Sequence, residues 1–175
     1  MFREVPVLPV VVPAAAAIFL AMLWYLHSRG RLSVPRAAVA LALCVYAAGV
    51  VANTVFPIYL NKSFTSQWKV YFEPLADYGV GDAVKNILVF VPVGIIVPLL
   101  LAKASWWRVV AAAAAFSLAI ELTQFLTDNL LGGGHLADAN DLLFNVIGGV
   151  LGFGLFAALS RVPAVAVFIN RFRWH

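Results

Sequence analysis

Charged residues are scarce in this sequence. Lys, Arg, Asp and Glu together make up 11% of the 175 residues, whereas 63% are apolar, and a soluble domain typically has about 25% charged residues. So few charges leave too little polar surface to face water, which argues against a soluble domain and predicts a single-domain integral membrane protein. The only cysteine, Cys44, lies inside an apolar run and excludes an intrachain disulfide.

A continuous basic face and the common catalytic motifs are also absent. The net charge is +4, but the basic residues stand singly or in pairs at the ends of apolar runs, as membrane topology requires. We therefore expect no nucleic-acid partner. The sequence contains no Ser-His-Asp spacing, no H-E-x-x-H, no Walker loop and no Cys/His zinc pattern.

Five apolar runs are long enough to cross a bilayer, which takes about 20 helical residues. Pro92 and Pro98 inside the third run are tolerated in membrane helices, and we expect kinks there. The basic stretch 27–31 after the first run does not resemble a signal-peptide cleavage site, so we expect that helix to be retained. The prediction is an all-α bundle of five transmembrane helices, with spans at about 8–26, 37–59, 83–101, 107–126 and 142–159.

The charges also predict an orientation. Lys and Arg mark cytoplasmic segments, and the segment 127–141 has Asp128, Asp138 and Asp141 but no Lys or Arg. We therefore expect the N-terminus outside and the C-terminus in the cytoplasm of a bacterial plasma membrane. The basic residues of the expected inner side are Arg29, Arg31, Arg36, Lys103, Arg108, Arg161, Arg171 and Arg173.

A polar stripe runs along the fourth span. Ser117, Glu121, Gln124 and Asp128 are spaced four, three and four residues apart, so they share one face of a helix. If the helix ends near residue 126, Glu121 lies about one and a half turns inside its outer end. An ionisable group at that depth usually faces the bundle interior or a water-filled cavity. The alternative is a structural hydrogen bond from Glu121 to a neighbouring helix.

A second stripe opens the fifth span. Asp138, Asp141 and Asn145 share one face, and Asp138 or Asn140 suits the helix N-cap. The same face continues to glycines at G-x-x-x-G spacing, which let another helix approach closely. We expect the third or fourth helix to pack there, against Gly148 and Gly152.

The amides and acids of the three last spans all fall in their outer halves, which predicts an outward-facing polar pocket. Three mechanisms remain open for it. Glu121 could act as a general base, carboxylates could hold Mg²⁺, Ca²⁺ or Mn²⁺, or the whole set could hydrogen-bond a polar headgroup. The metal candidates are Asp138, Asp141 and Glu121, and the other pocket residues are Asn86, Ser117, Gln124 and Asn145.

Three ordered motifs across residues 82–154 resemble the VanZ-like family of small membrane proteins. They are NILVFVPVG at 86–94, SxxxExxQ at 117–124 and DxxDxxxNxxGG at 138–149. The chain departs from the family where an arginine and a further acid are usual, since it has His135 and Asn140. If that arginine contacts an anion, such contact would be weaker here, or would need protonated His135.

The resemblance implies a role at the outer face, in envelope or glycopeptide biology, since the family is named for a teicoplanin-resistance protein. We therefore expect the pocket to bind or modify a lipid-linked envelope precursor or a glycopeptide. Two alternatives stay open, namely a hydrolase or transferase that uses Glu121, and an assembly subunit that recruits a partner through the Gly148 face. Transport fits less well because five spans offer no paired repeats.

Overall fold

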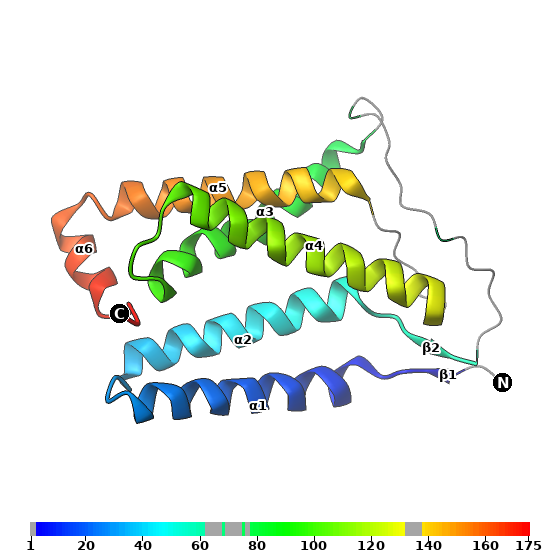
Figure 1. Cartoon of the computed structure of the whole chain (residues 1–175), viewed down its shortest axis with the longest axis horizontal. Helices are drawn as coiled ribbons and strands as arrows, with labels where there is room; N and C mark the ends of the chain where they lie inside the picture. The colour runs from blue at the N-terminus through cyan, green and yellow to red at the C-terminus, as the bar shows by residue number, and fades with distance from the viewer. Residues whose placement is uncertain (1–2, 62–67, 69–74, 76–77, 132–137) are drawn as a thin grey trace.

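The computed structural model describes residues 3–61, 68, 75, 78–131 and 138–175. Within these residues, five helices are long and apolar enough to cross a membrane, which confirms the expected number of spans. A short sixth helix and a pair of two-residue antiparallel strands were not expected (Figure 1). The elements are β1 (Arg3–Glu4), α1 (Val7–Ser28), α2 (Val34–Thr54), β2 (Tyr59–Leu60), α3 (Val80–Leu100), α4 (Trp106–Leu131), α5 (Ala139–Leu159) and α6 (Pro163–Asn170).

The long helices form two groups. The helices α3, α4 and α5 pack together, and the pair α1 and α2 forms a hairpin along one side (Figure 1). The most extensive contact joins α3 to α5. A small core of Val50, Phe90, Val93, Ala113 and Ile120 lies where α2 meets the three-helix group.

Glycines allow the close contact between α3 and α5. A Cβ atom added to Gly148 would lie 2.2 Å from the carbonyl oxygen of Ile87, and one added to Gly152 would lie 2.0 Å from that of Val91. These separations leave no room for any side chain, so the two backbones touch directly. The expectation that this glycine face packs on a neighbouring helix is confirmed, and the neighbour is α3.

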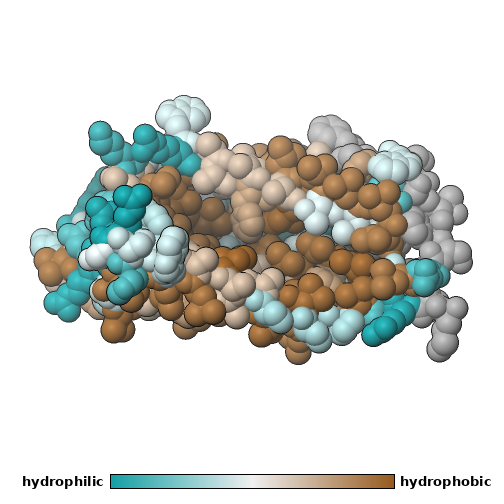
Figure 2. All heavy atoms as spheres, turned by 60° about the horizontal axis from the view of Figure 1, so that its bottom comes forward, coloured by the Kyte–Doolittle hydropathy of each residue, from teal (hydrophilic) through white to brown (hydrophobic). Residues whose placement is uncertain are grey.

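The surface divides into an apolar belt and two polar ends. The belt follows the length of the helices, and hydrophilic residues gather beyond it on the face shown in Figure 2. Exposed leucines such as Leu8, Leu20 and Leu118 belong to spanning helices. Because a membrane supplies an apolar solvent, these exposed leucines need no further partner.

Two helix ends differ from the expectation by five residues each. The second helix ends at Thr54 rather than at residue 59, and Tyr59 pairs with β1 instead. Pro57 explains the earlier end, since proline has no N–H to continue the ladder and disfavours a helical residue before it. The fourth helix continues to Leu131 rather than residue 126, and the side chains of Thr127 and Asn129 bond back to its own carbonyls.

The C-terminal tail joins the two helix groups at the end of the bundle that carries Arg31, Arg36 and Arg173, which we call the basic end. The Arg31 guanidinium donates to the carbonyl of Trp174 at 2.9 Å, and Arg36 Nε donates to the carbonyl of Arg173 at 2.7 Å. The backbone N–H of Trp174 in turn donates to the carbonyl of Leu99 at the end of α3, at 2.9 Å. The start of α2 is thereby held to the end of α3.

Candidate functional site

The start of α5 lies at the end of the bundle where Glu121, Asp138 and Asp141 gather, which we call the acidic end. Asp138 is its N-cap, and the Asp138 side chain accepts a hydrogen bond from the N–H of Asn140 at 2.8 Å. The N–H of Asp138 donates to Glu121 Oε2 on α4 at 2.9 Å. The N-terminus of a helix favours negative charge, so this helix start accounts for carboxylates gathering around it.

Glu121 lies deeper in its helix than expected. Because α4 ends at residue 131, Glu121 is ten residues (131 minus 121) from that end, which is almost three turns. It nevertheless lies level with the first residues of α5, through its bond to Asp138. The last turns of α4 therefore extend beyond the start of α5.

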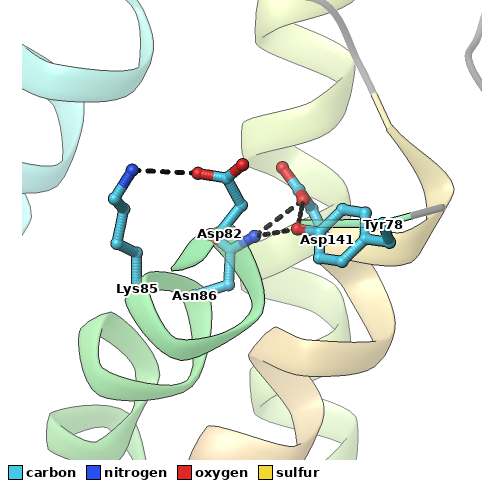
Figure 3. Close-up of polar contacts among 5 residues, drawn as sticks. All are labelled: Tyr78, Asp82, Lys85, Asn86 and Asp141. Atoms are coloured by element: carbon cyan, nitrogen blue, oxygen red, sulfur yellow. Dashed lines mark hydrogen bonds and ion pairs between the residues drawn. The ribbon is translucent and has the colours of Figure 1, made fainter. Parts of the chain in front are cut away.

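A three-residue cluster links α3, α5 and the segment before α3 (Figure 3). Asn86 Nδ2 donates to Asp141 Oδ1 and to the Tyr78 hydroxyl, at 2.7 Å in each case. The Tyr78 hydroxyl donates to the same carboxylate oxygen of Asp141. The Tyr78 ring stacks on Phe144 with centroids 5.0 Å apart. Asp141 and Asn86, both expected in the site, are thus brought together, and Tyr78 joins them.

Sequence reasoning did not identify Tyr78 as part of the site. Burial raises the pKa of Tyr78 above its usual value, and the hydrogen bond to Asp141 and the charge of that carboxylate add to the effect. Tyr78 therefore remains a neutral donor at physiological pH rather than a phenolate. Its place just before the polar start of the third span was the available signal.

Asp82 takes no part in this cluster, although it lies one turn from Asn86 on α3. Its carboxylate pairs with Lys85 at 2.9 Å, and both side chains are mostly exposed. Figure 3 shows the Asp82 carboxylate joined to Lys85 and to neither Tyr78 nor Asp141. A surface ion pair of this kind contributes little, about 0–1 kcal/mol.

Two of the expected residues form a contact between helices below the acidic end. Asn145 Nδ2 donates to Ser117 Oγ at 2.9 Å, and both side chains are buried. Gln124 is buried as well. Among the described residues, Gln124 Oε1 and Asn145 Oδ1 have no hydrogen-bond partner. The structure thus separates the expected pocket residues into layers.

A groove of about 330 Å³ lies between α4 and α5. Among the described residues that line it, Glu121 and Asp138 are the two expected site residues, and the others are apolar. These apolar residues are Leu118, Leu122, Phe125, Ala139 and Leu142. The surface that these residues present to the groove is apolar and lipid-like, and Glu121 and Asp138 form part of its wall.

Asn129, which sequence reasoning did not identify, contacts Trp68 in the segment between β2 and α3. Asn129 is buried on α4, and its Oδ1 accepts a hydrogen bond from the N–H of Trp68 at 2.7 Å. The Trp68 ring packs edge-on against Phe125, with centroids 5.6 Å apart. Because Phe125 lines the groove, Trp68 supports that wall from outside.

The other expectations about the site have plain outcomes. Among the described residues, no three His, Cys, Asp or Glu side chains gather closely enough to hold a metal ion, so Glu121, Asp138 and Asp141 do not form such a set. His135 lies outside the described residues. The glycine face is occupied by α3, so Gly148 is not free to recruit a partner, which corrects that alternative.

Comparison with known proteins identifies the family. The family model described as VanZ/LLP1 matches residues 14–160, which is most of the chain. Searches of curated proteins and of solved structures found no match. The five apolar helices indicate a multi-pass membrane protein. The chain therefore belongs to the VanZ/LLP1 family.

Proposed function

We propose that this protein binds the polar part of a cell-envelope amphiphile in the groove between α4 and α5. The observation that carries the proposal is the lining of the groove, in which Glu121 and Asp138 lie among apolar side chains. Binding sites for small molecules commonly combine apolar walls with a few placed polar groups. The apolar walls suit a lipid chain, and the carboxyl groups suit hydrogen-bond donors.

The charge at this end narrows the class of headgroup. Glu121 and Asp138 belong to the groove wall, Asp141 is one turn further along α5, and the cation Lys85 on α3 is paired to Asp82. Carboxylates only accept hydrogen bonds, so hydroxyl and amino groups are favoured over phosphate here. The sugar or peptide part of a lipid-linked envelope precursor, or a glycopeptide, has this chemistry.

The location of the groove follows from the proposed orientation. Lys and Arg gather at the other end of the bundle, which the positive-inside rule assigns to the cytoplasm. The groove then opens on the outer side of the plasma membrane, where envelope precursors and glycopeptides are found. A link to teicoplanin-type resistance is part of this proposal and has its own readout, the susceptibility of cells that carry each variant.

The test is cross-linking with a photoreactive lipid-linked precursor in membranes that contain the full-length protein. Glu121→Gln removes the carboxylate from the groove, and we expect the cross-linking yield to fall about tenfold, as for loss of a hydrogen bond to a charged group. Asp128→Asn is the matched control, since it makes the same change on α4 outside the groove lining. Equal yields from wild type and Glu121→Gln would rule out the proposal.

A further inference from the structure

A second groove, of about 320 Å³, lies at the opposite, basic end of the bundle. It lies between the end of α3, the segment that follows α3 and the end of α5, and the C-terminal tail contributes Arg173 to its lining. Its polar lining comes from Lys103, Ser160 and Arg173. Its apolar lining includes Pro98, Phe153 and Phe156, and the Arg173 guanidinium carbon lies 5.7 Å from the Phe156 ring centroid.

The polar atoms at this end lack acceptors. Within the described part of the chain, Ser160 Oγ, Arg173 Nε and Trp174 Nε1 are buried and have no hydrogen-bond partner. Of these residues, Ser160 and Arg173 line the groove. The arginine and tryptophan nitrogens can only donate, and the serine hydroxyl can also donate. Buried donors are normally paired, because an unpaired one loses its hydration without compensation. The missing group is therefore a hydrogen-bond acceptor.

The charge around the groove favours an anionic acceptor. Lys103 and Arg173 are cations, and none of the described residues that line the groove is Asp or Glu. The start of α4 at Trp106 adds the positive end of a helix dipole. The carbonyl ends of α3 and α5 act in the opposite sense, but the N–H of Trp174 and that of Arg161 already bond to carbonyls there.

His175 adds little to this charge. Burial, and then the nearby guanidinium groups of Arg173, Arg31 and Arg36, lower the pKa of His175 below its ordinary value of 6.5. The imidazole is therefore mostly neutral at pH 7. The fixed positive charge of the groove comes from Lys103 and Arg173.

We infer that this groove binds a phosphoryl group, either in the headgroup of an anionic phospholipid or as free phosphate. A phosphoryl group offers several acceptor oxygens for the unpaired donors. Its negative charge would balance the charges of Lys103 and Arg173. The apolar walls of Pro98, Phe153 and Phe156 suit the glycerol and first methylenes of a lipid. This site is independent of the function proposed for the groove between α4 and α5.

The experiment measures binding to the purified full-length protein in detergent by the shift of its unfolding temperature. The added probes are dioleoyl phosphatidylglycerol, inorganic phosphate and dioleoylglycerol, which has the same chains without phosphate. We expect the phosphatidylglycerol to stabilise the protein and dioleoylglycerol to have no effect. Stabilisation by inorganic phosphate alone would also support the phosphoryl site and would identify its source as soluble.

Two variants separate the groove from general attraction to basic residues. Arg173→Gln removes Nε and the charge but keeps the backbone carbonyl that Arg36 binds, and we expect about tenfold weaker phosphatidylglycerol binding. Ser160→Ala removes only the hydroxyl and should weaken binding by a smaller factor. Arg171→Gln is the matched control, because Arg171 is exposed and does not line the groove, and its effect should stay below about twofold. Equal weakening by Arg173→Gln and Arg171→Gln, or no stabilisation by either phosphate probe, would overturn the inference.

Discussion

The three-helix group and the α1–α2 hairpin are built differently, although both are apolar. In α5 the buried residues include two asparagines and three glycines, whereas α1 buries only Val11 and Leu26. Glycine lets α3 and α5 touch, and this close approach brings Asn86 within hydrogen-bond distance of Asp141. In this protein, the hydrogen bond between Asn86 and Asp141 therefore depends on the close packing of α3 and α5.

The hairpin contributes none of the described polar contacts at the acidic end. Its polar links to the other group lie elsewhere, from the Tyr46 hydroxyl to the carbonyl of Val89 at 2.8 Å and from Arg36 to the tail. Most of α1 faces outward, where lipid replaces protein as its neighbour. Substitutions in the two regions should therefore have different consequences.

The largest difference is expected from added methyl groups. Gly152→Ala places a Cβ 2.0 Å from the carbonyl oxygen of Val91, which forces α3 and α5 apart and should lower the free energy of unfolding by about 1–3 kcal/mol. Gly49→Ala on α2 meets nothing within 4 Å and should be neutral or stabilising by up to about 1 kcal/mol. Denaturation of both purified variants in mixed detergent measures the contrast. Similar losses in the two variants would show that glycine packing does not distinguish the regions.

The next effect concerns the cluster at the acidic end. Asp141→Ala leaves the Tyr78 hydroxyl and the Asn86 amide without their shared acceptor, which should cost about 1–2 kcal/mol of unfolding free energy. Because the two side chains interact, Tyr78→Phe should lower the unfolding free energy less in the Asp141→Ala protein than in the wild type. Asp82→Ala is the control, and it should cost less than about 1 kcal/mol. Strictly additive losses for Asp141 and Tyr78 would contradict the cluster.

A smaller effect is expected where the tail joins the two regions. Arg36→Ala removes the bonds to the carbonyls of Arg173 and Arg31, at a cost of about 0.5–1.5 kcal/mol. Hydrogen exchange should become faster at the basic ends of α1 and α2 and stay unchanged in α5. Arg161→Ala, at an exposed position, should leave exchange in the hairpin unaltered. Uniformly faster exchange throughout the bundle would show that the regions unfold as one unit.

The smallest effect is a pH dependence of the tail. The pKa of His175 is lowered in the folded protein by burial and by Arg173, Arg31 and Arg36, so folding favours the neutral imidazole. Its contribution to stability is therefore present above the ordinary pKa of 6.5 and is lost as pH falls through the lower folded value. An NMR titration of His175 should give a pKa below 6.5 that rises in Arg173→Gln. An unshifted pKa of His175 in both proteins would contradict this pH dependence of stability.

Much of this arrangement was predictable from the sequence because apolar run length and charge placement define membrane spans. The five helices and the glycine contact followed from those patterns. The ends of α2 and α4 did not, because Pro57 lies inside an apolar run and residues 127–131 are partly polar yet remain helical. A periodic pattern shows which face a residue occupies but not which loop residue meets it.

The candidate site was predictable only in part, as a set of residues but not as a set of contacts. Spacing along one helix grouped Ser117, Glu121 and Gln124, and the structure places them in different surroundings. Tyr78 and Trp68 come from a segment without periodicity, so no pattern could assign their partners. Contacts between a loop and a helix depend on the folded path of the chain.

The most direct test of the central claim is capture of a lipid at the groove itself. A photoreactive amino acid would replace Leu122, which lines the groove, or Leu8 on α1, which is also exposed. In bacterial membranes the probe at Leu122 should capture an envelope amphiphile that carries a sugar or peptide, and Glu121→Gln should abolish that capture. The probe at Leu8 should capture bulk phospholipid only. Identical captured lipids at the two positions, unaffected by Glu121→Gln, would contradict a specific site between α4 and α5.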